Sequence, residues 1–276
     1  MCRIDRSGAR ICNGALLAIA LEDPLMTMPT ATRHLLQACA LAALCLQAAT
    51  SFAHTTFKLQ ATEGTTEDNA LKIGHGCEVS PGRNIPVIAQ SVVFPFSNPV
   101  LSASDASTVG SLTDVIVQGS LAGLVDTIQD RSIFETQGEK LTLADGTVVG
   151  FWSRNGRLSV KSRGRVPFQF TPPSFVSTSC AKRLLVKVAV ADICDVANPT
   201  LAAGKVNLWI PDNGSQYAAE GKAAGIDGVG AAATLTVNRN LTTNPLPLAC
   251  GAGIDVTVTP SAAEVDRRLP IPRYWQ

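Results

Sequence analysis

Few side chains after residue 53 could take part in chemistry. His54 and His75 are the only histidines in that part of the chain. A histidine in first position has a free α-amine next to its ring nitrogen, and the two groups together can chelate one metal ion. Imidazole suits copper, and Cu(II) has the highest affinity among the first-row divalent metals for such sites. His54 is therefore a candidate copper ligand if the chain is cleaved immediately before it.

Residues 28–53 predict such a cleavage. Met28 and a short segment carrying Arg33 precede an apolar run from Leu35 to Ala49, and small residues follow at Ser51 and Ala53. A positive start, an apolar centre and small residues at −3 and −1 are typical of a secretory signal peptide. We expect the mature chain to begin at His54 and to be periplasmic or secreted. Residues 1–27 do not fit in front of a signal peptide, and we interpret them as a mis-annotated start.

Composition argues against several classes of partner and activity. The net charge is +1, which provides no electrostatic reason to expect nucleic acid as a partner. The apolar run is shorter than the roughly 20 residues of a membrane-spanning helix, so we expect no membrane span. No phosphate-binding loop, dinucleotide fingerprint or G-x-S-x-G elbow occurs. With so few catalytic side chains, we expect no enzyme.

Four of the eight cysteines remain after the predicted cleavage: Cys77, Cys180, Cys194 and Cys250. An even number in an exported chain predicts two disulfides, for which three connectivities are possible. A thiolate metal site is the alternative, although no C-x-x-C pair is present.

The segments that must position these residues have the pattern of β-strands. Apolar or alternating runs bounded by Gly, Pro and Asn indicate strands near residues 87–94, 141–143, 147–152, 158–161, 184–190, 206–210, 234–237 and 254–259. Short strands at this spacing predict an all-β sandwich or barrel. Residues 97–127 predict a long loop with a short helix, and residues 217–224 predict one or two helical turns. Residues 269–276 predict an extended Pro-rich tail.

Several segments resemble the YcnI-like family of exported proteins. They are His54-Thr-Thr-Phe, Gly64-Thr-Thr-Glu67 and Leu71-Lys-Ile-Gly-His-Gly-Cys-Glu-Val-Ser-Pro81, followed more loosely by the Trp152 turn and by Cys194 with Trp209. The resemblance covers residues 54–212. It implies an immunoglobulin- or cupredoxin-like β-sandwich that binds Cu(II) through a single-histidine brace.

The resemblance also implies a ligand set. His54 corresponds to the first histidine and Glu67 to the family's glutamate, with Glu63 as a competing carboxylate. Trp209 corresponds to the tryptophan beside the metal, and Trp152 is held in reserve. His75 is expected to be structural, with a second-ligand role as the alternative. The cysteines that match imply the pairs Cys77–Cys194 and Cys180–Cys250.

Residues 213–276 have no counterpart in the resemblance. We expect them to form a C-terminal extension of packed β-structure that ends in the Pro-rich tail.

Three functions follow as hypotheses. The first is an exported copper-binding protein in copper trafficking or sequestration, with other periplasmic copper-handling proteins as partners. The second is an oxidative copper enzyme of the polysaccharide monooxygenase type, in which His75 would join His54 at the metal. The third is a structural surface β domain without a metal.

Overall fold

The computed structural model describes residues 3–4, 10–11, 54–196 and 201–271. The chain divides into two units, Met1–Phe52 and Ala53–Gln276. In the first, β1 (Arg3–Ile4) pairs with β2 (Arg10–Ile11) in antiparallel orientation. The predictions of a mis-annotated start over 1–27 and a signal peptide over 28–53 fall almost wholly outside the described residues. Among those residues, no helix is both long and apolar enough to cross a membrane.

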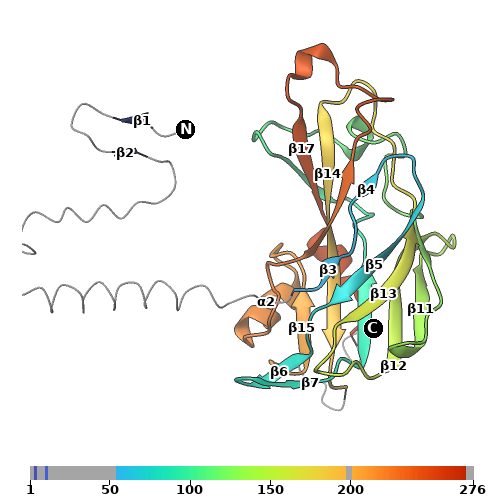
Figure 1. The fold of residues 1–276 in the computed structure, drawn as a ribbon, viewed down its shortest axis with the longest axis vertical. Coiled ribbons are helices and arrows are strands. Elements are labelled where there is room, and N and C mark those ends of the chain that lie inside the picture. Colours follow the sequence, from blue (N-terminus) through green and yellow to red (C-terminus); the bar gives the residue numbers. More distant parts are fainter. Residues whose placement is uncertain (1–2, 5–9, 12–53, 197–200, 272–276) are drawn as a thin grey trace, which may run out of the picture. The chain divides into compact units, whose positions relative to one another are not determined.

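The second unit is the predicted all-β sandwich (Figure 1). Its smaller sheet has the strand order β10-β13-β5-β3, and a nine-stranded sheet lies against it. The smaller sheet contains β3 (Thr56–Phe57), β5 (Glu67–Ile73), β10 (Val125–Thr127) and β13 (Gly164–Phe170). The large sheet contains β4 (Ala61–Thr62), β8 (Ala89–Val93), β9 (Val100–Ala103), β11 (Phe134–Thr142), β12 (Val148–Gly156), β14 (Ala181–Ile193), β15 (Val206–Trp209), β16 (Ala233–Asn238) and β17 (Ile254–Thr259). A short hairpin of β6 (Cys77–Ser80) and β7 (Arg83–Ile85) pairs separately.

The long strand β14 organises the large sheet. Its first part lies between antiparallel β16 and parallel β17, and its last part lies between β8 and β15. Burial alternates over the first part and becomes continuous from Val188 to Ile193. Alternation indicates one face in solvent, whereas continuous burial indicates that both faces are covered.

The main core fills the space between the two sheets. Phe57, Leu71 and Phe168 from the smaller sheet pack in one cluster with Val190 and Trp209 from the large sheet. The rings of Phe57 and Phe168 meet edge to face with centroids 5.8 Å apart. Such aromatic contacts add about 0.5–1.5 kcal/mol to the free energy gained by burying the rings.

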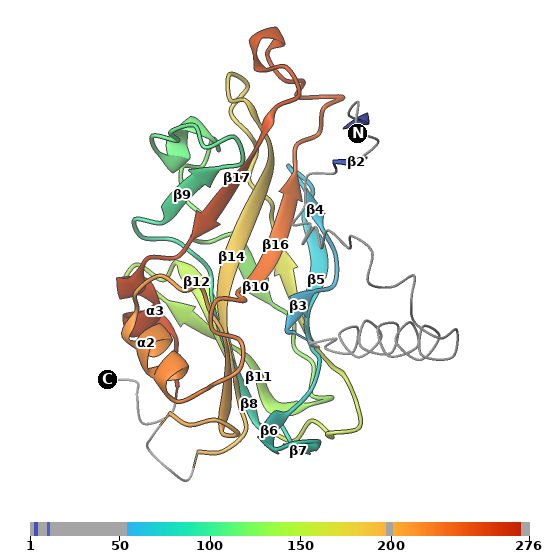
Figure 2. The same ribbon diagram turned by 90° about the vertical axis from the view of Figure 1, so that its left-hand side faces the viewer.

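Two helices cover the opposite face of the large sheet at the lower part of β14 (Figure 2). They are α2 (Gln216–Ala223) and α3 (Ala262–Arg268). Ser215 and Ser261 accept hydrogen bonds from the first turns of their helices, as N-cap residues do. Tyr217 and Val265 belong to the second core cluster, together with Ile193 and Leu208 of the sheet. The helix predicted at 217–224 is therefore confirmed.

Residues 213–276 are not an addition to a finished sandwich. β16 and β17 pair directly with β14, so the C-terminal segment supplies two strands of the large sheet and both helices that cover it. The start of the predicted extended tail is packed against the domain, because Leu269 and Ile271 are buried in the second core. Residues 272–276 lie outside the described part.

Most of the predicted strands are present, including the hairpin of β11 and β12. The strand expected over 158–161 is wrong, because only Leu158 forms an isolated bridge, to Val87. Within 97–127 the short helix occurs as η2 (Leu112–Asp114), together with the strands β9 and β10. The strands β5 and β13 were not predicted, although they form the centre of the smaller sheet.

Candidate metal centre at His54

His54 lies two residues before β3, which is the edge strand of the smaller sheet. The next residue, Thr55, is buried, and Thr56 pairs with Lys72 of β5. The imidazole of His54 packs against the indole of Trp209, with ring centroids 5.1 Å apart and planes inclined by 33°. The structure therefore brings together two residues of the predicted site that are far apart in the sequence.

Trp209 ends β15 and points into the main core. Its side chain is 1% exposed, and the residue pairs with Val190 of β14. The indole Nε1–H donates a hydrogen bond to Oδ2 of Asp192 at 2.6 Å. A buried indole needs such an acceptor, because folding removes its N–H group from hydrogen bonding with water. The face of the ring remains available to His54.

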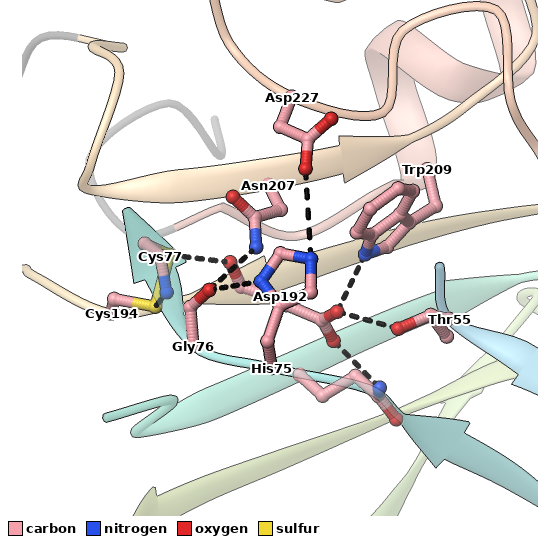
Figure 3. Close-up of a disulfide and its surroundings, with 10 residues drawn as sticks. Thr55, His75, Gly76, Cys77, Asp192, Cys194, Asn207, Trp209 and Asp227 are labelled. Atoms are coloured by element: carbon pink, nitrogen blue, oxygen red, sulfur yellow. Dashed lines mark hydrogen bonds and ion pairs between the residues drawn. A yellow bond between two sulfur atoms is a disulfide. The ribbon is translucent and has the colours of Figure 1, made fainter. Parts of the chain in front are cut away.

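Asp192 is a buried carboxylate that sequence reasoning missed (Figure 3). Its Oδ2 accepts a second hydrogen bond from the hydroxyl of Thr55 at 2.7 Å, and Oδ1 accepts one from Nε2 of Gln90 at 2.7 Å. Burial raises the pKa of Asp192 above its usual range, whereas the three hydrogen bonds act in the opposite direction. One carboxylate thereby connects the segment after His54 with β8 and β15.

His75 reaches the same indole from another side. Its ring centroid lies 6.0 Å from that of Trp209, with the planes nearly perpendicular at 81°. Nδ1 donates to the carbonyl oxygen of Gly76, and Nε2 lies 3.7 Å from Oδ2 of Asp227 (Figure 3). Both ring nitrogens of His75 therefore face groups of the protein itself.

Two glycines allow this arrangement. A Cβ atom on Gly76 would lie 1.9 Å from the carbonyl oxygen of Ile85, so only glycine lets the His75 segment approach β7. Gly228 has φ +99°, and a Cβ atom there would lie 2.7 Å from the indole of Trp209. The chain that carries Asp227 can therefore pass directly over the tryptophan.

A disulfide anchors the segment that follows His75. Cys77 is bonded to Cys194, which joins the segment after His75 to the end of β14. The amide of Cys77 also donates to Sγ of Cys194 at 3.1 Å. The second disulfide joins Cys180 to Cys250. Both pairs are those implied by the family resemblance, and that prediction is confirmed.

The prediction that Glu67 shares a site with His54 is wrong. Thr56 pairs with Lys72, and Glu67 lies five residues further along β5, about 17 Å away at the rise of a strand. His54 precedes Thr56 and lies further away still, because β3 and β5 are antiparallel. Burial raises the pKa of Glu67, but this carboxyl group is not beside the histidine.

The two reserve residues are also elsewhere. Glu63 is buried and accepts hydrogen bonds from the amides of Phe175 and Asn240 and from Nδ2 of Asn244, which is a structural role. Trp152 follows Phe151, which stands in one cross-strand row with Val190 and Trp209. Successive residues of a strand point to opposite faces, so Trp152 faces away from the main core.

The donors available at His54 are few. Among the described residues, no group of three or more His, Cys, Asp or Glu side chains is arranged to hold a metal ion. A histidine brace needs fewer side chains, because the α-amine of the first residue is itself a ligand. That amine exists only if the peptide bond before His54 is cleaved.

Comparison of the chain with protein-family models and with curated proteins finds no match. The description of the centre therefore rests on its geometry. The polar residues that sequence reasoning missed are Asp192, Thr55, Asp227 and Asn207, whose Nδ2 donates to the carbonyl oxygen of Gly76 at 3.3 Å. The sequence does carry a signal for Asp192, since it is a carboxylate inside the otherwise apolar run from Val188 to Ile193, two positions before Cys194.

Proposed function

We propose that this protein is exported, is processed to begin at His54 and binds Cu(II) through the α-amine and imidazole of that residue, in copper trafficking or sequestration. The observation that carries the proposal is the position of His54 against Trp209. Oδ2 of Asp192 accepts hydrogen bonds from both Thr55 and Trp209, so the histidine is held beside a buried indole.

The indole is a suitable neighbour for such an ion. A buried aromatic wall on one side of the ligand limits the access of water and holds the imidazole in one orientation, as the surroundings of a metal ligand commonly do. Two disulfides are in accord with an oxidising compartment, where an exported protein would meet Cu(II). The resemblance to the YcnI-like family supports the same function.

The arrangement of His75 favours binding over catalysis by a two-histidine copper enzyme. That chemistry requires a nitrogen of His75 to face the metal. In the structure, Nδ1 donates to Gly76 and Nε2 faces Asp227. We therefore infer a structural role for His75, which fixes the segment that leads to Cys77.

The proposal is tested by Cu(II) titration of two forms of the protein. One form begins at His54. The matched control begins at Ala53, so that its free α-amine is on Ala53 and not on His54. We expect the first form to bind one Cu(II) ion at micromolar concentration or below and the control to bind much more weakly. Equal binding by both forms, or none by the first, would refute the proposal. Mass spectrometry of the native N-terminus tests the cleavage itself.

A further inference from the structure

Asp192 has an unusual environment for a carboxylate. It is 1% exposed and lies in β14 where both faces of the strand are buried. Its hydrogen-bond partners are Thr55, Gln90 and Trp209, and no Lys or Arg side chain within the described ranges forms an ion pair with it. Buried charges in proteins are usually paired with an opposite charge or lie near a metal ion.

The hydrogen bonds show how the two oxygens are used. Gln90 and Trp209 donate through N–H groups, and an ionised carboxylate can only accept. Three donors therefore suit the charged form of Asp192. These three donors use most of the roughly four acceptor sites of the carboxylate, and two of them come from Thr55 and Trp209, so Asp192 is placed to act on His54 through these neighbours.

Two of its hydrogen-bond partners adjoin His54. Thr55 is separated from Asp192 by 137 positions and is covalently attached to His54. Trp209 forms the wall against which the imidazole packs. Loss of the carboxylate would break the hydrogen bonds to Thr55 and Trp209 together. The same carboxylate therefore holds both the residue next to His54 and the ring that packs against it.

We propose that Asp192 is the positioning residue of the copper centre and supplies the nearby negative charge that the resemblance had assigned to Glu67. This inference rests on the proposed function. A Cu(II) ion at His54 would offset the cost of a buried carboxylate, and the carboxylate would in turn stabilise the ion and fix its histidine ligand. Mutation of a residue that orients a metal ligand without binding the metal typically lowers metal affinity 10- to 100-fold.

Glu63 provides a matched control. It too is a buried carboxylate that accepts three hydrogen bonds. It follows β4, which pairs with Asn238 of β16, and Asn238 pairs with Arg183 of β14. Asp192 lies nine residues further along β14, about 30 Å away at the rise of a strand. Loss of either carboxylate should destabilise the fold, but only one of them should affect copper.

The experiment compares Asp192→Asn with Glu63→Gln in the protein that begins at His54. We expect Asp192→Asn to bind Cu(II) roughly 10- to 100-fold more weakly and to change the electron paramagnetic resonance spectrum of the bound ion. Glu63→Gln should lower the melting temperature while the affinity and the spectrum stay as in the wild type. Wild-type affinity and an unchanged spectrum in folded Asp192→Asn would overturn the inference and leave the proposed function standing.

A second variant covers the case in which Asp192→Asn does not fold. Thr55→Val removes one hydrogen bond to the carboxylate and nearly conserves volume. It should weaken Cu(II) binding and alter the spectrum in the same direction, and wild-type behaviour of this variant would also overturn the inference. Failure of the wild-type protein itself to bind Cu(II) would refute the proposed function, and this inference with it.

Discussion

Trp209 and Trp152 lie on opposite faces of the same sheet. The row Phe151, Val92, Val190 and Trp209 faces the main core, and the adjacent row, which contains Trp152 and Leu208, faces the other way. The ring of Trp209 packs against the imidazole of His54. The two tryptophans are therefore separate optical reporters of the two faces.

This relationship predicts how fluorescence responds to copper. Cu(II) bound at His54 should quench the emission of Trp209, because the indole is adjacent to the ion. Quenching should persist in Trp152→Phe and be largely lost in Trp209→Phe. The latter also deprives Asp192 of a donor, which should cost about 1–3 kcal/mol of stability. Titration of both variants with Cu(II) measures the effect, and the opposite pattern would contradict the position of the centre.

Glu67 should be dispensable for copper. In Glu67→Gln we expect wild-type Cu(II) affinity, because the register of β5 keeps this residue about 17 Å or more from His54. A marked loss of affinity in the titration would instead support the glutamate ligand implied by the resemblance.

The same variant should alter the pH dependence of stability. Burial raises the pKa of Glu67 in the folded protein, so ionisation is less favourable there than in the unfolded chain. The wild type should therefore lose stability relative to Glu67→Gln as the pH rises from the ordinary glutamate pKa through the raised one. Below that range the difference between the two should be constant, which denaturant unfolding between pH 3 and 7 can measure.

Removing each disulfide in turn should distinguish effects on stability from effects on metal binding. Replacing either pair by serine should cost about 2–4 kcal/mol, as is typical for native disulfides. Only Cys77→Ser with Cys194→Ser should also weaken Cu(II) binding, because these residues stand two positions after His75 and Asp192 respectively. Cys180→Ser with Cys250→Ser is the control, and an equal effect of both pairs on copper would show that the loss follows from general destabilisation.

Truncation tests the role of the C-terminal segment. A fragment of residues 54–212 should fail to fold, because it lacks β16 and β17, which flank the first part of β14. Removal of residues 1–53 should leave the fold intact, because that cut lies one residue from the boundary between the two units. Circular dichroism and limited proteolysis distinguish the outcomes. A cooperatively folded 54–212 fragment would restore the view of residues 213–276 as an extension.

Much of the sandwich could be predicted because its strands have local signals. The hairpin of β11 and β12 is marked by Asp145-Gly146, and β17 alternates over its whole length. β5 has no comparable signal, since it contains the polar residues Glu67, Asp68 and Asn69, of which Asn69 is buried through hydrogen bonds to the backbone of Leu59. Partners of that kind are visible only once the chain is folded.

The candidate centre was predictable only in part, for a similar reason. His54, Trp209 and the cysteine pairs were identified from residue type and from the family resemblance. The contacts that single out Asp192 are made with Thr55 and Trp209, which are separated from it by 137 and 17 positions. The error over Glu67 has the same origin, because a motif records the presence of a carboxylate but not the strand register that determines its distance.

The 137 positions between Thr55 and Asp192 have a consequence for the timing of assembly. Contacts between distant segments form only after most of the chain is available. β14 also pairs with β17, which lies near the C-terminal end of the chain. If the chain crosses a membrane N-terminus first, His54 emerges long before its tryptophan wall exists. Any metal bound at His54 would then be held stably only after translocation, and its identity would reflect the compartment of destination.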